Sequence, residues 1–446
     1  MSHPLLTSPI GAALLRLAGP TTAFMGVQIF VALFDVWLVG MLGLESLAAS
    51  AIVGPFIVVV LNVSSGAFGG AVAASIARAL GGGRRDDAAA LVIHALVVAA
   101  VLGALCTLFA WTVAPTLYRL LGAEGEVLRQ VRGLSDVWFS GVVAVWAANM
   151  LSGALRGAGN AVLPARIGLV GTCVYIPLSA LLALGIAGFP GLGLVGAGIA
   201  GITASTVSLA LQLRALWSGR LGFTPSLGGK RLQRGLFREI LGVASMGFVI
   251  TLSGSVGAVV MTALVGRFGT AALAGYAIAS RLEPILGALS YGIGTGTTTL
   301  IGIAAGANDW VRAVRVAWIS ALWAGALVGT LAGIIALAPE SWSRLFTSDP
   351  DVIAASVAYL TRVTPFYVLY GVGLTLHFAS QGAGRMGVPL VAILARIAVA
   401  LGGGWIAVEV MGQGLPSLFW ASASSLVIYC ATMAGSLWLR PWRPTS

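Results

Sequence analysis

Residues 15–42 read LRLAGPTTAFMGVQIFVALFDVWLVGML, an apolar run with one acid near its far end, Asp35, and one base near its start, Arg16. The hydrocarbon core of a bilayer is about 30 Å thick, so a helix needs roughly 20 apolar residues to cross it. The run is long enough to cross and shows no cleavage-site pattern, so we expect a retained transmembrane helix rather than a signal sequence. Similar runs recur along the whole chain.

The composition supports this reading, because 58% of the 446 residues are hydrophobic and only 9% are charged. Such a chain cannot bury its apolar surface in one soluble core, so the lipid bilayer is an expected partner. The runs lack the period-2 alternation of a membrane β-barrel. We therefore predict an all-α polytopic membrane protein with twelve transmembrane helices. The predicted spans are 15–42, 47–80, 88–113, 134–156, 160–188, 192–217, 237–266, 270–305, 311–338, 352–381, 387–411 and 416–438.

The positive charge of the chain is best explained by membrane topology. The formal net charge is +11, but the bases are scattered between spans and form no stripe with interleaved aromatic residues, so no nucleic-acid partner is expected. Most Lys and Arg residues fall on the same side of the membrane as the termini. Basic loops remain in the cytoplasm, so we predict both termini there, in a bacterial inner membrane. We expect a monomer.

No residues of the catalytic or metal-binding kind form a pattern in the sequence. The three cysteines, Cys106, Cys173 and Cys430, are isolated in apolar runs without metal-ligand spacing. No nucleotide-binding P-loop, metalloprotease His pair or nucleophile elbow is present. We therefore expect a protein that is not an enzyme and that holds no metal and no organic cofactor.

An internal repeat divides the chain into halves. The residues LVGMLG at 38–43 and LA at 47–48 recur as LVGRFG at 264–269 and LA at 273–274, and GAG at 157–159 recurs at 382–384. We predict an N-lobe at 1–217, a basic cytoplasmic linker at 218–236 and a C-lobe at 237–446. Six spans per lobe is an even number, so the lobes are parallel repeats around a central cavity, the plan of a secondary transporter.

Several short motifs resemble the multidrug and toxic compound extrusion family, of the DNA-damage-inducible-protein-F-like type. They are Gln28 through Asp35 to Gly40 and Gly43, Leu47-Ala48-Ala49, Gly81-Gly82-Gly83, the AIASRLE run at 277–283 and Gly306-Ala307-Asn308. The resemblance implies two six-helix bundles around a V-shaped cavity. It also implies alternating-access export of amphipathic organic compounds, often cations, in exchange for H⁺ or Na⁺.

The same resemblance directs attention to Asp35. Some members have an ion site that joins an acid on the first span to an Asn and an Asp on the fifth, and Asp35 matches the first of these. Thr172 and Ile176 stand where the other two would be, so a second carboxylate is missing and H⁺ is expected rather than Na⁺. Inside the membrane an ionised carboxylate costs roughly 2.5 to 3.5 kcal/mol, so Asp35 is either a coupling residue or an acid satisfied by Gln28 or Asn149.

A second group of charged residues lies in the eighth and eleventh predicted spans. Glu283 and Arg281 are two residues apart, so they do not face each other on a helix and each needs another partner. We consider Arg396 as the counter-ion of Glu283. The group is either an ion or substrate site or an ion pair that fixes helix packing.

Other candidates are weaker. His377 could titrate near neutral pH, and Tyr367 and Tyr291 could present aromatic faces to a cation, but all three could equally serve packing. A flippase for a lipid-linked sugar or another lipid-like substrate is an alternative function, although such a protein would need several basic residues for pyrophosphate. Only Arg281 and Arg396 lie in the inner spans.

Overall fold

The computed structural model describes residues 4–186, 190–219, 223–227, 231–439 and 442, and these contain helices but no strand. Among these described residues, ten helical segments are long and apolar enough to cross a membrane, and the bent pair α7 (Gly125–Ser140) and α8 (Val142–Gly157) makes an eleventh. The remaining predicted span, 270–305, is divided at Arg281 into α12 (Thr270–Ser280) and α13 (Leu282–Gly306). Pro284 explains the break, since its ring clashes with the carbonyl of Ser280, where α12 ends. The fold is that of an all-α polytopic membrane protein.

The described residues form two compact units. Unit 1 comprises residues 23–244, and unit 2 comprises residues 2–22 together with 245–446. These units differ from the predicted lobes in two places, because the first turns of α2 belong to unit 2 and the first turns of α11 belong to unit 1. Parts of the predicted linker, 220–222 and 228–230, and both predicted cytoplasmic ends, 1–3 and 443–446, lie outside the described residues.

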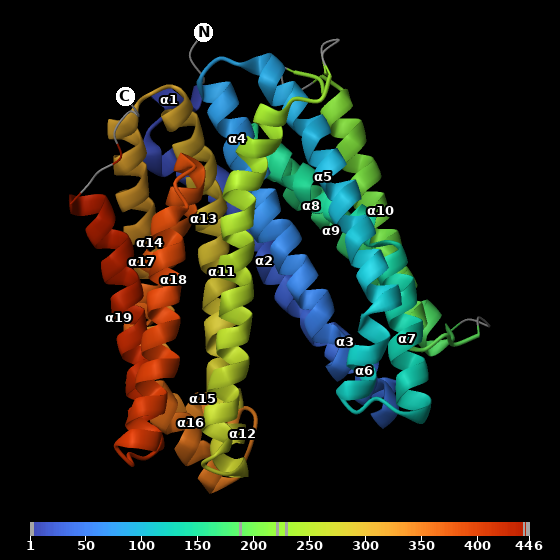
Figure 1. The fold of residues 1–446 in the computed structure, drawn as a ribbon, viewed down its shortest axis with the longest axis vertical. Coiled ribbons are helices and arrows are strands. Elements are labelled where there is room, and N and C mark those ends of the chain that lie inside the picture. The colour runs from blue at the N-terminus through green and yellow to red at the C-terminus, as the bar shows by residue number, and fades with distance from the viewer. Residues whose placement is uncertain (1–3, 187–189, 220–222, 228–230, 440–441, 443–446) are drawn as a thin grey trace. The chain divides into compact units, whose positions relative to one another are not determined.

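Each unit is a bundle of long helices (Figure 1). Helices α2 (Ile10–Met41) and α11 (Arg234–Gly266) pass from one unit into the other. Unit 1 also holds α3 (Leu44–Asn62), the π-helix η1 (Val63–Gly69), α4 (Gly70–Gly81), α5 (Arg85–Thr112), α6 (Ala114–Leu120), α7 (Gly125–Ser140), α8 (Val142–Gly157), α9 (Val162–Leu184) and α10 (Leu194–Trp217). Unit 2 also holds α1 (Pro4–Thr7), α12 (Thr270–Ser280), α13 (Leu282–Gly306), α14 (Trp310–Leu337), α15 (Pro339–Arg344), α16 (Pro350–Val363), the 3₁₀ turn η3 (Thr364–Phe366), α17 (Tyr367–Ala383), α18 (Gly387–Ile397), the π-helices η4 (Ala398–Gly403) and η5 (Ile406–Val410), and α19 (Leu415–Leu439).

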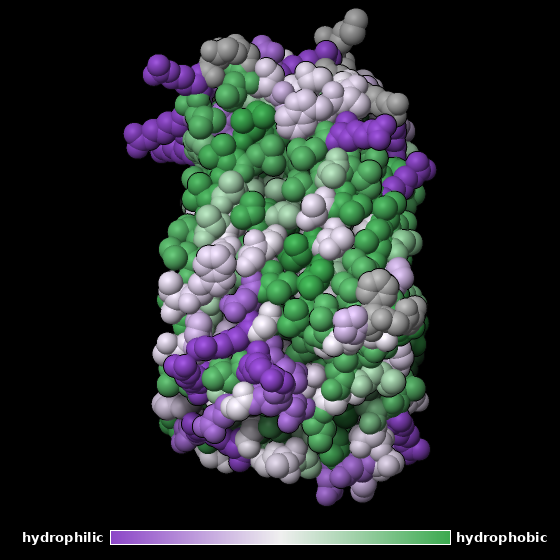
Figure 2. Space-filling model, turned by 90° about the vertical axis from the view of Figure 1, so that its right-hand side faces the viewer, coloured by the Kyte–Doolittle hydropathy of each residue, from purple (hydrophilic) through white to green (hydrophobic). Residues whose placement is uncertain are grey.

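The outward surface is apolar where a bilayer would cover it. Figure 2 shows one face on which hydrophobic side chains form a broad area and hydrophilic ones gather toward the two ends. On α5, for example, Leu105, Leu108 and Trp111 are more than half exposed. In water such a surface would be unstable, so these helices are suited to lipid.

The sequence repeat corresponds to a repeat of backbone geometry. Gly43 and Gly269 precede α3 and α12 with φ of 99° and 102°, and Gly159 and Gly384 follow α8 and α17 with φ of 83° and 72°. Because these φ values are in the left-handed region, glycine is favoured at each position. Gly83 and Asn308 are a third pair of equivalent positions in the repeat, and their φ values of 74° and 63° are also left-handed. The internal repeat is therefore present in three dimensions within each unit.

Close helix crossings repeat in the same way. A Cβ atom added to Gly157 would overlap the carbonyl oxygen of Ala73, and one added to Gly382 would overlap that of Thr298. Gly382 and Thr298 lie 225 residues after Gly157 and Ala73, so the two crossings are equivalent positions of the sequence repeat. One turn before Gly157, Gly153 packs against Gly69 on η1 just as closely. Small residues let helix backbones approach where lipid supplies no hydrophobic driving force.

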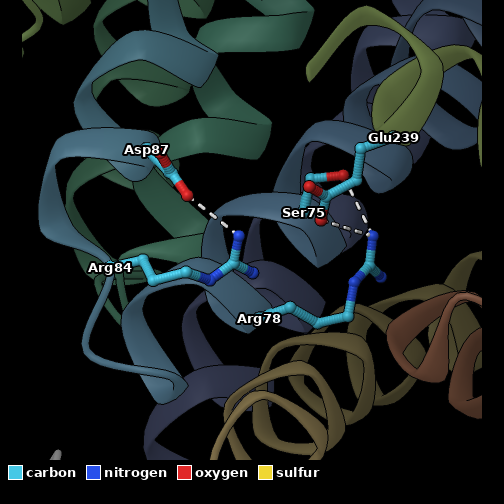
Figure 3. Close-up of polar contacts among 5 residues, drawn as sticks. All are labelled: Ser75, Arg78, Arg84, Asp87 and Glu239. Carbon is cyan, nitrogen blue, oxygen red and sulfur yellow. Dashed lines mark hydrogen bonds and ion pairs between the residues drawn. The ribbon is translucent and has the colours of Figure 1, made fainter. Parts of the chain in front are cut away.

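The start of α11 is attached to unit 1 by an ion pair. Arg78 on α4 donates from Nη2 to Oε1 of Glu239 at 3.2 Å and to Oγ of Ser75 at 3.1 Å, as Figure 3 shows. Arg84 and Asp87 form a separate pair at 2.9 Å around the turn between α4 and α5. The Arg78 and Glu239 side chains are only 15% and 23% exposed, so water screens this pair weakly.

His94 on α5 makes a second attachment. Its Nδ1 atom donates to the Ala90 carbonyl at 2.7 Å, which leaves Nε2 free to accept the backbone N–H of Gln233 at 2.9 Å. The fully buried ring also packs edge-on against Phe237, with 4.6 Å between ring centroids. His94 therefore holds the end of the linker and the first turn of α11 against unit 1.

We predict that Gly153→Ala destabilises the protein, because the added methyl group meets the backbone of Gly69. Overpacking of this kind costs about 1–3 kcal/mol. Gly54→Ala on α3 is the matched control, since no atom lies within 4 Å of the added methyl group there. Thermal unfolding in detergent should show a lower midpoint for the first variant and an unchanged or higher one for the second. Equal midpoints would contradict the close crossing.

We predict that Glu239→Gln lowers the unfolding midpoint more than Glu126→Gln does. The first change removes a carboxylate from a partly buried arginine, and the loss of such a charged partner costs about 1–3 kcal/mol. Glu126 pairs with an Arg129 side chain that is 79% exposed, and surface pairs contribute less than about 1 kcal/mol. A smaller effect at Glu239 than at Glu126 would show that the Arg78 contact does not anchor α11.

Candidate functional site

In unit 1, α2 and α9 face each other with two polar links. The Tyr175 hydroxyl on α9 donates to Oδ1 of Asp35 on α2 at 2.6 Å. Two turns earlier on α2, Gln28 accepts a long hydrogen bond from Thr172 through Oε1, at 3.4 Å. Thr172 and Tyr175 lie on one face of α9 because residues three apart on a helix are neighbours. The Asp35 carboxylate is the only charge in this group.

The environment of Asp35 is apolar and partly open. The side chains of Asp35 and Tyr175 are half-buried, and the Phe34 ring lies edge-on to the Tyr175 ring at 6.5 Å between centroids. A hydrogen bond to an ionised carboxylate is roughly twice as strong as one between neutral groups. Protonation of Asp35 therefore weakens its link to Tyr175, and the contact between α2 and α9 responds to the charge of one group.

Asn149 does not join this group in the described contacts. Its Nδ2 atom donates to Oγ of Ser64 at 2.7 Å, on the π-helix η1. The sequence offered Gln28 and Asn149 as possible partners of Asp35 and did not single out Tyr175. The sequence did contain a hint of Tyr175. It lies three residues after the candidate Thr172, so on a helix its phenol is on the same face, one turn further along.

In unit 2, Glu283 and Arg396 form an ion pair. Nη2 of Arg396 on α18 donates to Oε1 of Glu283 on α13 at 2.6 Å. The Arg396 guanidinium also lies over two aromatic rings, with its central carbon 5.2 Å from the centroid of Tyr370 and 5.8 Å from that of Tyr429. The contact between Glu283 and Arg396 that the sequence suggested is thus present in the structure.

Arg281 has a different environment from Glu283. Its side chain is exposed, and its guanidinium carbon lies 5.3 Å from the centroid of the Phe346 ring. Arg281 therefore takes no part in the contacts that join Glu283 to Arg396.

Further tyrosines extend the cluster around this pair. Tyr367 shares a hydroxyl–hydroxyl hydrogen bond with Tyr359 at 3.2 Å, and its ring lies 6.2 Å from that of Tyr370. Tyr276 packs edge-on against Tyr359 at 5.5 Å. Tyr359 and Tyr429 were not among the sequence candidates, because α19 carries no charged residue and the charged residues of α16, Asp351 and Arg362, lie near its two ends.

His377 and Tyr291 belong to another part of unit 2. The buried His377 ring on α17 lies edge-on to Phe378, at 5.6 Å between centroids, and Tyr291 on α13 contacts the same Phe378 at 5.5 Å. These rings form an aromatic packing group. The contacts found for His377 are those of a core residue.

We predict that the Asp35–Tyr175 hydrogen bond contributes more to stability than the Gln28–Thr172 one. A double-mutant cycle of Asp35→Asn and Tyr175→Phe should give a coupling of about 1.5–3 kcal/mol, as expected for a bond to a charged group. The matched cycle of Gln28→Ala and Thr172→Val should give less than about 1 kcal/mol. Unfolding in detergent measures both, and equal couplings would contradict the charge-assisted bond.

Comparison with known proteins identifies relatives for almost the whole chain. The MatE family model matches residues 20–181 and 248–406. A probable multidrug resistance protein NorM of Deinococcus radiodurans is 28% identical over 95% of this chain and 94% of its own length. A FAD transporter of Shewanella oneidensis is 23% identical over 90% of this chain and 88% of its own.

Solved structures share the fold. A MOP superfamily transporter from Pyrococcus furiosus superposes with a TM-score of 0.90 at 22% identity, over 99% of this chain and 98% of that one. An outward-facing multidrug resistance MATE family transporter of the same superfamily gives a TM-score of 0.88 at 22% identity. The match covers 99% of this chain and 98% of that one.

Proposed function

Because this chain belongs to the MatE family of efflux transporters, we propose that it exports amphipathic organic compounds in exchange for H⁺. The exchange proceeds by alternating access across a bacterial inner membrane, with both termini in the cytoplasm and the protein acting as a monomer. The observation that carries the proposal is the hydrogen bond of 2.6 Å between the Tyr175 hydroxyl and Asp35 within a membrane-spanning helix pair. An ionisable residue at such a place is a functional candidate by default.

The chemistry of this group favours a proton over Na⁺. A hard cation is held by several oxygen ligands, often including more than one carboxylate. Here the apolar side chain of Ile176 follows Tyr175 on α9, and Tyr175 directs its O–H at one of the two Asp35 oxygens. A proton needs only one carboxylate, and Asp35 provides it.

Proton binding can be converted into movement through the same bond. With Asp35 ionised, the charge-assisted bond holds α2 against α9. With Asp35 protonated, that bond loses roughly half its strength and the helices are freer to separate. An inward proton can thereby loosen the contact between α2 and α9, and this movement is the step that we propose to be coupled to outward substrate transport.

The driving force sets a limit on export. If one H⁺ enters for each monovalent cation that leaves, no net charge crosses the membrane and only the pH difference contributes. That difference supplies about 1.4 kcal/mol per pH unit, which corresponds to a tenfold concentration gradient. The relatives named as multidrug resistance proteins support a drug-like substrate, and another relative is named as a FAD transporter.

The test is transport by purified protein in liposomes. We expect an imposed pH gradient to drive movement of an ethidium-type cation, and a Na⁺ gradient at constant pH to drive none. Asp35→Asn should lower the gradient-driven rate at least tenfold. Asp136→Asn, at an exposed acid on α7, is the matched control and should leave the rate unchanged.

Transport driven by Na⁺ alone, or an Asp35→Asn variant as active as the native protein, would rule out coupling through Asp35. Folded protein that moves no organic cation under either gradient would point instead to a lipid-like substrate.

A further inference from the structure

Three fully buried hydroxyls of unit 2 make no hydrogen bond within the described part of the chain. They belong to Ser290 on α13, Ser320 on α14 and Thr375 on α17. Other buried hydroxyls of these helices are satisfied, since Thr297 and Ser380 each donate to the carbonyl one turn earlier, at 2.9 Å and 3.0 Å. An unpaired hydroxyl in an apolar interior is destabilising, so a set of three needs an explanation.

The crossing of α14 and α17 brings two of these hydroxyls to the same level. A Cβ atom added to Gly371 would lie 2.9 Å from the carbonyl oxygen of Ala324, so the two backbones meet there. The spans that contain α14 and α17 are consecutive in the chain, and they therefore run in opposite directions. Ser320 lies one turn before Ala324, and Thr375 lies one turn after Gly371. The register thus places Ser320 opposite Thr375.

The crossing of α13 and α17 brings the third hydroxyl to this level. A Cβ atom added to Gly294 would overlap the Phe378 ring, and the Thr298 hydroxyl donates to the Phe378 carbonyl at 2.9 Å. Because the single span α14 separates them in the chain, α13 and α17 run in the same direction. Ser290 lies one turn before Gly294, and Thr375 lies three residues before Phe378. Ser290 and Thr375 are therefore at one height in the bundle.

The three helices pack against one another in pairs, so the hydroxyls approach one junction. Because the hydroxyls do not bond one another directly, a molecule that joins them must be small and must both donate and accept hydrogen bonds. None of the three helices carries an acid within one turn of these positions. A buried cation without a counter-charge is strongly disfavoured, so the chemistry fits a neutral molecule.

We propose that Ser290, Ser320 and Thr375 form a binding site for one ordered water molecule, which joins α13, α14 and α17. A buried water typically makes about three hydrogen bonds to polar groups that lack other partners, and three hydroxyls supply that number. Hydroxyls of membrane helices commonly hydrogen-bond across to neighbouring helices, and the water extends that link to three helices at once. The site concerns the internal cohesion of unit 2 and does not depend on the proposed export.

Thermal unfolding in detergent separates a hydrated site from a dry one by the sign of the effect. Thr375→Val or Ser290→Ala removes one partner of the water, and we expect each to lower the unfolding midpoint by about 1–3 °C. The triple variant Ser290→Ala/Ser320→Ala/Thr375→Val leaves the water no partner among the three hydroxyls, so it should unfold at or above the native midpoint.

Two other results would overturn the water site. If the hydroxyls are unpaired and dry, each single substitution raises the midpoint. If they act independently in packing, the losses of the single variants add in the triple variant. Thr297→Val and Ser380→Ala are the matched controls, because they make the same chemical changes at buried hydroxyls bonded within their own helices. They should change the midpoint less than the site variants do, and equal changes would also contradict the proposal.

A second measurement needs no unfolding. In the full chain with protonated threonine methyl groups and a deuterated background, we expect a nuclear Overhauser cross-peak between the Thr375 methyl group and water, and none for Thr297. Ser290→Ala/Ser320→Ala should weaken that cross-peak. Its absence from the native protein, or equal cross-peaks at both threonines, would overturn the proposal. A native midpoint that depends on Na⁺ or K⁺, and that loses this dependence in the triple variant, would assign the site to a cation instead.

Discussion

A charge inside the membrane must be neutralised, and this requirement explains why the few charged groups of the spans lie where they do. Asp35 is satisfied by a phenol, and Glu283 by a guanidinium. The two solutions have different chemical consequences. A phenol leaves the carboxylate as the only charge, so a proton can neutralise it. A guanidinium already balances its partner, so the Glu283–Arg396 pair carries no net charge.

The backbone is subject to the same requirement. Regular helices satisfy their own polar groups, and each departure from regularity therefore needs a local reason. In unit 1 the π-helix η1 lies against α8, where Gly69 and Gly153 meet and Ser64 receives the Asn149 amide. In unit 2, irregular geometry occurs at Arg281, after Arg396 and at the 3₁₀ turn η3. Several irregular segments thus lie beside polar contacts.

Much of this architecture could be predicted from the sequence because helix length and loop charge are local properties. The predicted limits 88–113 and 192–217 lie close to those of α5 and α10, and the repeated glycines mark equivalent turns. Contacts between distant helices were harder to predict. The Glu283–Arg396 pair could be proposed because two buried charges need each other. The partner of Asp35 could not be chosen among neutral residues by charge, so Gln28 and Asn149 were considered and Tyr175 was missed.

The division of the chain into units has a consequence for synthesis. Residues 4–22 precede the rest of unit 2 by more than 220 residues of chain, yet they pack with it, where Thr22 contacts Gly292 and Arg312 holds the carbonyls of Leu5 and Ser8. Contacts so far apart in the chain close late, after the intervening segments have been made. The first turns of α2 must therefore wait until unit 1 and most of unit 2 have left the ribosome before they reach their final position.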